Sequence, residues 1–202
     1  MINAVAIVCG YLLGSIPSGY IAARLKKGID IRSVGGRVTG AINVYYEVGL
    51  VAGILVLLVD IGKGIGAVLL ARWLGVDVIF QLLAGLILIP FGLFLKLTSH
   101  CGGRGGATTI GVLLILMPKA IPFWLGTCVI VLLITKNLTF CYSMGFICFP
   151  VVAGVIYGDM ALVAFSAGLL GFLGIRYIPR MKEMHSKAGG SWRKVISRGS
   201  IN

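Results

Sequence analysis

Charged side chains are scarce in this chain. Asp, Glu, Lys and Arg together make up only 12% of its 202 residues, whereas hydrophobic residues make up 58%. The mean hydropathy is +1.04. A soluble domain carries far more charge than this, so the composition excludes the soluble globular classes. We expect an all-α integral membrane protein, built as a multi-pass helical bundle.

Acidic residues are scarcer still, with 6 Asp and Glu against 18 Lys and Arg. Such a basic excess can indicate a nucleic-acid partner. Here, however, the charges stand at the ends of apolar runs and in a tail, where membrane proteins use them to set topology and to meet anionic groups. We therefore expect membrane lipids as partners and no nucleic acid.

Disulfide and metal signals are also missing. The 5 cysteines are odd in number and lie mostly within apolar sequence, where cysteine serves as a small hydrophobe. His100 and Cys101 form half of a possible metal site, but no second ligand pair has the spacing to complete it. We predict no disulfide framework, no metal and no cofactor, and we favour a plain loop role for His100.

No basic segment precedes the first apolar run, so we interpret that run as a retained helix and not as a cleaved signal peptide. The apolar runs cover residues 2–23, 48–74, 78–95, 107–135, 140–157 and 162–178. Pro118 and Pro122 divide the fourth run into two segments, of which 107–117 is short for a crossing and could be tilted or re-entrant. These runs predict about seven transmembrane helices.

Basic residues mark two cytoplasmic regions. One follows the first run, with Arg24, Lys26, Lys27, Arg32 and Arg37. The other is the C-terminal region, with Arg176, Arg180, Lys182, Lys187, Arg193, Lys194 and Arg198. Positive residues stay on the cytoplasmic side, so the N-terminus should be outside, the C-terminus cytoplasmic and the number of crossings odd. We expect one transmembrane domain over 1–180 and a basic tail over 181–202.

A polar, glycine-dense segment, 99–109, separates two apolar runs. Gly102, Gly103 and Gly105 lack a Cβ, so successive backbone N–H groups can converge on one anion, while Arg104 supplies a charge with paired donors. This pattern is typical of a phosphate cradle. The glycines alone favour a flexible turn in which Arg104 marks the cytoplasmic side.

Two ionisable residues interrupt the second apolar run. Asp60 and Lys63 are three positions apart and so lie on one helical face. Charges inside a hydrocarbon layer usually pair, line a cavity or mark a substrate path, and a structural ion pair and a functional one both fit. The adjacent Gly62, Gly64 and Gly66 indicate the close approach of another backbone or of a ligand.

Two more polar segments precede that run. Within 14–20, Ser15 and other small residues surround Pro17, which interrupts the helix; the pattern fits either close helix packing or substrate contact. In the following loop, Gly35, Gly36 and Arg37 could place donors near a second anionic group. A plain connecting loop is the alternative.

Five segments of the chain, taken in order, resemble the signatures of one enzyme family, the PlsY-type acyl-phosphate:glycerol-3-phosphate acyltransferases. The segments are Gly-Ser-Ile-Pro-Ser-Gly-Tyr at 14–20, Asp-Ile-Arg at 30–32, Gly-Ala-Ile-Asn-Val at 40–44, Asp-Ile-Gly-Lys-Gly at 60–64 and Gly-Gly-Arg-Gly-Gly-Ala-Thr-Thr-Ile-Gly at 102–111. Any one match is weak, whereas the ordered series is specific.

This resemblance implies a bacterial inner-membrane enzyme that moves a fatty acyl group from acyl phosphate to the 1-hydroxyl of glycerol 3-phosphate, forming lysophosphatidic acid. Both substrates carry phosphate, which needs cationic and N–H donors. The candidate substrate- and phosphate-binding residues are Gly102, Gly103, Arg104, Gly105, Lys63, Asn43, Ser15 and Arg180, with Asp60 as the supporting ion-pair partner of Lys63. The sequence does not indicate how many copies of the chain associate.

The chain departs from the family pattern at several positions. Gly36 and Tyr46 stand where the family has serine and arginine, and Arg104 replaces a lysine. The last motif, at 174–180, lacks the family's histidine and asparagine, so no catalytic residue is assigned. Three hypotheses follow: a divergent acyltransferase, a catalytically lapsed paralogue that keeps a phosphate or lipid pocket, and a small transporter.

Overall fold

The structure is a computed structural model that describes residues 2–77, 81, 105–187 and 189–190. All regular elements in these ranges are helices, in agreement with the expected all-α class. The described chain forms two compact units, Met1–Leu116 and Met117–Asn202. Each unit is described by itself below.

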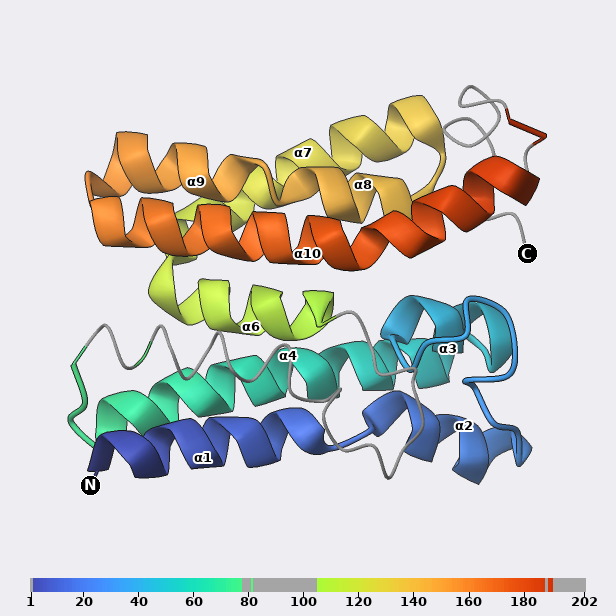
Figure 1. Ribbon diagram of the computed structural model, residues 1–202, viewed down its shortest axis with the longest axis horizontal. Helices are drawn as coiled ribbons and strands as arrows, with labels where there is room; N and C mark the ends of the chain where they lie inside the picture. Colours follow the sequence, from blue (N-terminus) through green and yellow to red (C-terminus); the bar gives the residue numbers. More distant parts are fainter. Residues whose placement is uncertain (1, 78–80, 82–104, 188, 191–202) are drawn as a thin grey trace. The chain divides into compact units, whose positions relative to one another are not determined.

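The first unit is organised around α4 (Leu50–Trp73), which contacts each of the other helices described in that unit (Figure 1). Those helices are α1 (Ile2–Ser15), α2 (Ser18–Lys27), α3 (Ala41–Glu47) and α6 (Gly106–Leu116). A long apolar helix at the centre gives these shorter helices a common surface to pack on.

The first apolar run is broken into α1 and α2, as Pro17 predicts. Proline has no N–H to donate and cannot continue the hydrogen-bond ladder. The second of these helices, α2, ends at Gly28, whose φ of 67° is left-handed and whose N–H donates to the Arg24 carbonyl oxygen. The chain then leaves the helix as a loop, 28–40, that returns to α3.

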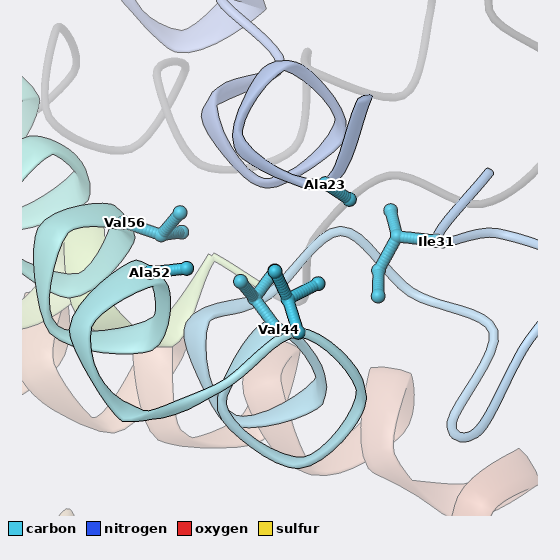
Figure 2. Close-up of a cluster of buried hydrophobic side chains, with 6 residues drawn as sticks. Ala23, Ile31, Val44, Ala52 and Val56 are labelled. Atoms are coloured by element: carbon cyan, nitrogen blue, oxygen red, sulfur yellow. The ribbon is translucent and has the colours of Figure 1, made fainter. Parts of the chain in front are cut away.

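A buried apolar cluster joins that loop to three helices (Figure 2). Ala23 comes from α2, Ile31 from the loop, Val44 from α3, and Ala52 and Val56 from α4. Ile31 and Val44 are completely buried. The loop 28–40 is therefore anchored to the helices at its apolar residue and not only at its ends.

Close contact between α4 and α6 depends on two glycines. A Cβ on Gly64 would fall on the Thr108 carbonyl oxygen, and a Cβ on Gly111 would fall on the Ile61 carbonyl oxygen. Small residues let helix backbones approach closely in a membrane. The approach expected at Gly64 is thus that of another backbone, the backbone of α6.

The second unit contains η2 (Pro118–Ala120), α7 (Ile121–Thr135), α8 (Leu138–Gly145), α9 (Cys148–Val152), the π-helical η3 (Ala153–Tyr157) and α10 (Met160–Lys187). The break between α6 and α7 at Pro118 confirms that 107–135 consists of two segments. An aromatic row joins α7, α8 and α9 through Trp124, Tyr142, Phe146 and Phe149.

Five helical segments of the described chain are long and apolar enough to cross a membrane. They are Ile2–Lys27, Leu50–Trp73, Pro118–Thr135, Phe140–Tyr157 and Met160–Glu183. The shorter α6 has 11 residues, about 16 Å of helix against a hydrocarbon core of about 30 Å. Apart from Gln81, the run 78–95 lies outside the described residues, so the total of about seven helices stays a prediction.

The expected domain of 1–180 with a tail from 181 also stays a prediction. The last helix, α10, is continuous through Lys187, past the position at which the tail was expected to begin.

Candidate functional site

Most of the predicted phosphate cradle lies outside the described residues. Gly102, Gly103 and Arg104 belong to that part of the chain, and the structure describes the loop from Gly105 onward. The Gly105 carbonyl oxygen accepts hydrogen bonds from the backbone N–H and the hydroxyl of Thr109, each at 2.9 Å. The described end of the loop therefore leads directly into the first turns of α6.

Ser15 lies at the end of α1, one residue before the break. Its hydroxyl donates to the Tyr11 carbonyl oxygen at 2.8 Å, one turn back in the same helix. This bond uses the only hydroxyl proton of Ser15 and leaves its oxygen as an acceptor. In this conformation Ser15 cannot donate to a phosphate.

Lys63 and Asp60 form the ion pair that their spacing predicts, with Nζ 2.6 Å from Oδ1. The Lys63 ammonium also donates to the Ile16 carbonyl oxygen at 2.8 Å and to Ser18 Oγ at 3.0 Å. An ammonium has three N–H donors, and here each has an acceptor. Lys63 is only 8% exposed, so a phosphate could reach it only by displacing one of these partners.

Asn43 has its side-chain amide directed into the loop 28–40. Its Oδ1 accepts from the Gly36 N–H at 2.7 Å, and its Nδ2 lies 2.9 Å from the Val38 carbonyl oxygen, with the carbonyl oxygens of Ile31 and Val34 at 3.2 and 3.3 Å. These contacts occupy the hydrogen-bonding groups of a buried amide. Asn43 thus organises the loop predicted to contact substrate.

The same loop contains an ion pair between Asp30 and Arg32. The guanidinium Nε donates to Asp30 Oδ1 at 2.9 Å and NH2 donates to Oδ2 at 2.8 Å, while the Arg32 backbone N–H also donates to Oδ1. These hydrogen bonds lower the pKa of Asp30 from 3.8 to about 2. Arg32 also lies over the Tyr20 ring, with Cζ 4.7 Å from the ring centroid, and so links the loop to α2.

We predict that Arg32→Gln raises the pKa of Asp30 to about 4, the value of an unpaired aspartate. Because the folded-state pKa is depressed, the stability that this pair contributes is present above about pH 4 and is lost as the pH falls toward 2. The measurement is the carboxyl carbon chemical shift of Asp30 against pH, in lipid nanodiscs. A titration midpoint near 4 in the unmodified protein would contradict the pairing.

Arg37 lies in the loop 28–40 in a backbone conformation that side chains seldom adopt. Its φ is 53°, and its N–H donates to the Val34 carbonyl oxygen at 3.0 Å. The side chain is exposed. A non-glycine residue at positive φ has a backbone cost that the surrounding contacts must offset, and here the contacts of Asn43 hold the adjacent residues.

The structure brings together only some of the predicted residues. Lys63 and Asp60 meet at the α1–α2 break, one residue from Ser15, and Asn43, in α3, directs its side chain into the loop that follows α2. Arg180 is in α10, in the second unit, and its side chain is not among those the structure describes.

Two residues of the segment 14–20 take part in these contacts but were not among the predicted site residues. Ser18 donates to Asp60 Oδ1 at 2.5 Å and accepts from Lys63, and Tyr20 packs against the guanidinium groups of Arg24 and Arg32. The available signal for Ser18 was its place at a proline break near an intramembrane lysine. A broken helix leaves a carbonyl oxygen that needs a donor, and the lysine that supplies it also reaches Ser18.

Taken together, the fold and these polar groups define a multi-pass helical membrane protein with a buried ion pair at the break of its first helix and a basic, hydrogen-bonded loop after that helix. Comparison with known proteins identifies its family. The family model for glycerol-3-phosphate acyltransferase matches residues 4–187, so the chain belongs to the glycerol-3-phosphate acyltransferase family, as its motif series suggested.

Relatives with the family name cover most of the chain. Glycerol-3-phosphate acyltransferase 2 of Dehalococcoides mccartyi is 42% identical over 198 residues, which are 98% of this chain and 94% of the relative. Glycerol-3-phosphate acyltransferase 4 of the same species, strain CBDB1, is 33% identical over 183 residues, 89% of this chain and 77% of the relative.

Solved structures agree with the assignment. The crystal structure of PlsY (YgiH), an integral membrane glycerol 3-phosphate acyltransferase, in its glycerol 3-phosphate form matches with a TM-score of 0.81 and 25% identity, covering 94% of each chain. The lysophosphatidic acid form matches at a TM-score of 0.78 and 24% identity and supports the fold. The chain is a membrane protein with the fold of this family.

Proposed function

We propose that the protein transfers a fatty acyl group from acyl phosphate to the 1-hydroxyl of glycerol 3-phosphate. The observation that carries this proposal is the family match over residues 4–187. The similar PlsY structure in its glycerol 3-phosphate form supports the acceptor, and the form with lysophosphatidic acid supports the product. The acyl donor rests on the resemblance of the motifs alone.

The reaction needs positioning more than it needs a covalent intermediate. The 1-hydroxyl oxygen attacks the carbonyl carbon of acyl phosphate, the bond from that carbon to the phosphate oxygen breaks, and the hydroxyl proton leaves with the released inorganic phosphate. Phosphate is a good leaving group, and holding the two reactants in line supplies much of the rate. The protein must therefore hold two phosphates close to one hydroxyl.

We assign the phosphate contacts to the glycine-dense loop and to basic side chains. Arg104, with the N–H groups of Gly102, Gly103 and Gly105, would bind one phosphate through charge-assisted hydrogen bonds. Arg37, which is exposed in the loop 28–40, and Arg180 are the further candidate cations. Asn43 would hold the loop 28–40 in shape.

We further propose a bacterial inner-membrane location with the N-terminus outside and the C-terminus cytoplasmic. The basic residues after the first span and in the C-terminal region support this orientation, because positive residues remain on the cytoplasmic side. Arg37 and Arg104 would then face the cytoplasm, where a water-soluble glycerol 3-phosphate can reach them.

We predict that Arg104→Ala raises the KM for glycerol 3-phosphate, since it removes a charge-assisted contact of about 1.5 to 3 kcal/mol, roughly 10- to 150-fold in binding. The measurement is initial rate against glycerol 3-phosphate concentration in lipid. Arg104→Lys, the residue type at this position in the family, is the matched control and should retain most of the activity. An unchanged KM in active Arg104→Ala protein would contradict the assignment.

The donor is tested by offering the purified protein acyl phosphate or acyl-CoA with labelled glycerol 3-phosphate. We expect labelled lysophosphatidic acid and inorganic phosphate in equal amounts with acyl phosphate, and no product with acyl-CoA. Product formation from acyl-CoA alone would overturn the proposed donor.

One observation favours a second function, a paralogue that binds these ligands without turnover. Residues 174–180 lack the family's histidine and asparagine, which removes the obvious side chain for accepting a proton. Strain CBDB1 of Dehalococcoides mccartyi carries family members numbered 2 and 4, 41% and 33% identical to this chain, so one genome can hold several copies. Binding of either substrate without product would favour this function.

A further inference from the structure

The buried ion pair lies at the point where the first membrane helix is interrupted. The last turn of α1 ends at Ser15 and α2 begins at Ser18, so the Ile16 carbonyl oxygen is at the C-terminal end of α1. The Lys63 ammonium donates to that oxygen at 2.8 Å. A cation at a helix C-terminus interacts favourably with the helix dipole.

The carboxylate of the pair faces the other helix end. Ser18 is the first residue of α2, and its hydroxyl donates to Asp60 Oδ1 at 2.5 Å. Negative charge is favourable at a helix N-terminus. The pair therefore bridges the break: the Lys63 ammonium meets the carbonyl end of α1, and both charges meet the hydroxyl of Ser18, the first residue of α2.

The helix α2, which begins at this pair, contacts the loop 28–40. A Cβ on Gly19 would fall on the Thr39 carbonyl oxygen, so α2 and the end of the loop are in direct backbone contact. Further along α2, Tyr20 packs against Arg32. At its far end, Lys27 Nζ donates to the Glu47 carbonyl oxygen at 2.7 Å. A change in the direction of α2 would therefore move the loop.

We propose that Asp60 and Lys63 are positioning residues, which fix the direction of α2 and thereby place the loop 28–40, with its exposed Arg37, for an anionic substrate. The proposal rests on the proposed function for the identity of that substrate. Lys63 acts through α2 and makes no phosphate contact of its own, because its three donors already have protein acceptors.

The test compares three variants with the unmodified protein in nanodiscs. The neutral pair, Lys63→Met with Asp60→Asn, removes both charges and leaves no unpaired ion. The reversed pair, Lys63→Asp with Asp60→Lys, keeps two opposite charges but removes the ammonium that donates to the Ile16 carbonyl oxygen. Arg72→Met is the matched control, since Arg72 is a cation of the same helix that binds Gln81 and the Ile115 carbonyl oxygen.

Two readouts are needed, because one must not depend on catalysis. Hydrogen exchange of the 28–40 amides reports the placement of the loop, and the steady-state constants report substrate binding. For the neutral and reversed pairs we expect exchange about tenfold faster in 28–40. We also expect a KM for glycerol 3-phosphate raised about tenfold, with kcat changed less than about threefold. Arg72→Met should leave the exchange of 28–40 unchanged.

Three results would overturn the proposal. If the 28–40 amides of the reversed pair exchanged at the rate of the unmodified protein, the contact between Lys63 and the Ile16 carbonyl oxygen would not place the loop. Wild-type exchange in the neutral pair would mean that the pair does not place the loop, and a raised KM without faster exchange would mean that Lys63 itself binds phosphate. If no variant or parent forms product, the proposed function fails, and exchange alone still decides the role of the pair. If the reversed pair does not fold, the exchange rates of the neutral pair decide whether the ion pair places the loop.

Discussion

Lys63→Met alone is expected to destabilise the protein by about 3–5 kcal/mol, because it leaves the Asp60 carboxylate in a largely buried site without its cation. The Asp60 side chain is 16% exposed and that of Lys63 8% exposed. The double variant Lys63→Met with Asp60→Asn should lose less stability, since it removes both charges and leaves no unpaired carboxylate.

The measurement is thermal unfolding in detergent, followed by tryptophan fluorescence, for the parent, the single variant and the double variant. Arg72→Met serves as the comparison for loss of a cation from the same helix, and we expect it to cost only about 1 kcal/mol for its hydrogen bonds. Equal melting temperatures of the single and double variants would show that the two charges are not coupled.

Gly111→Ala is expected to cost about 3 kcal/mol or more. The new methyl group would fall on the Ile61 carbonyl oxygen, and backbone cannot move aside as a flexible side chain can. The two helices would have to separate, losing packing along their contact, and packing is a principal source of helix association within a membrane.

Gly62→Ala is the matched control, because it adds the same methyl group to α4 at a position where a Cβ meets no atom of the described residues within 4 Å. Alanine is the better helix former by about 1 kcal/mol, so this variant should be neutral or slightly stabilised. Equal stability of Gly111→Ala and Gly62→Ala would contradict the close approach of α4 and α6.

The helical architecture was predictable because it depends on local features of the sequence. Long apolar runs dictate helices in a membrane. Pro17 and Pro118 predicted the two breaks that are seen, since proline cannot donate in the helix ladder. The spacing of Asp60 and Lys63 predicted their ion pair, because positions three apart share a helix face.

The contacts of the site were less predictable because they depend on tertiary neighbours. Asn43 was predicted as a substrate contact, yet its amide binds Gly36 and Val38 in the preceding loop. Lys63 was predicted as a phosphate contact, yet it also binds the Ile16 carbonyl oxygen, 47 positions earlier. A sequence shows that such a polar group needs a partner, but the fold decides which partner it has.

The central claim is that this chain carries out acyl transfer without the histidine and asparagine found in the last motif of its family. The most direct test is acyl transfer by the purified protein in lipid, with acyl phosphate and labelled glycerol 3-phosphate as substrates. We predict lysophosphatidic acid in proportion to the amount of protein, with formation dependent on Arg104. Folded protein that binds either substrate but forms no product would contradict the claim.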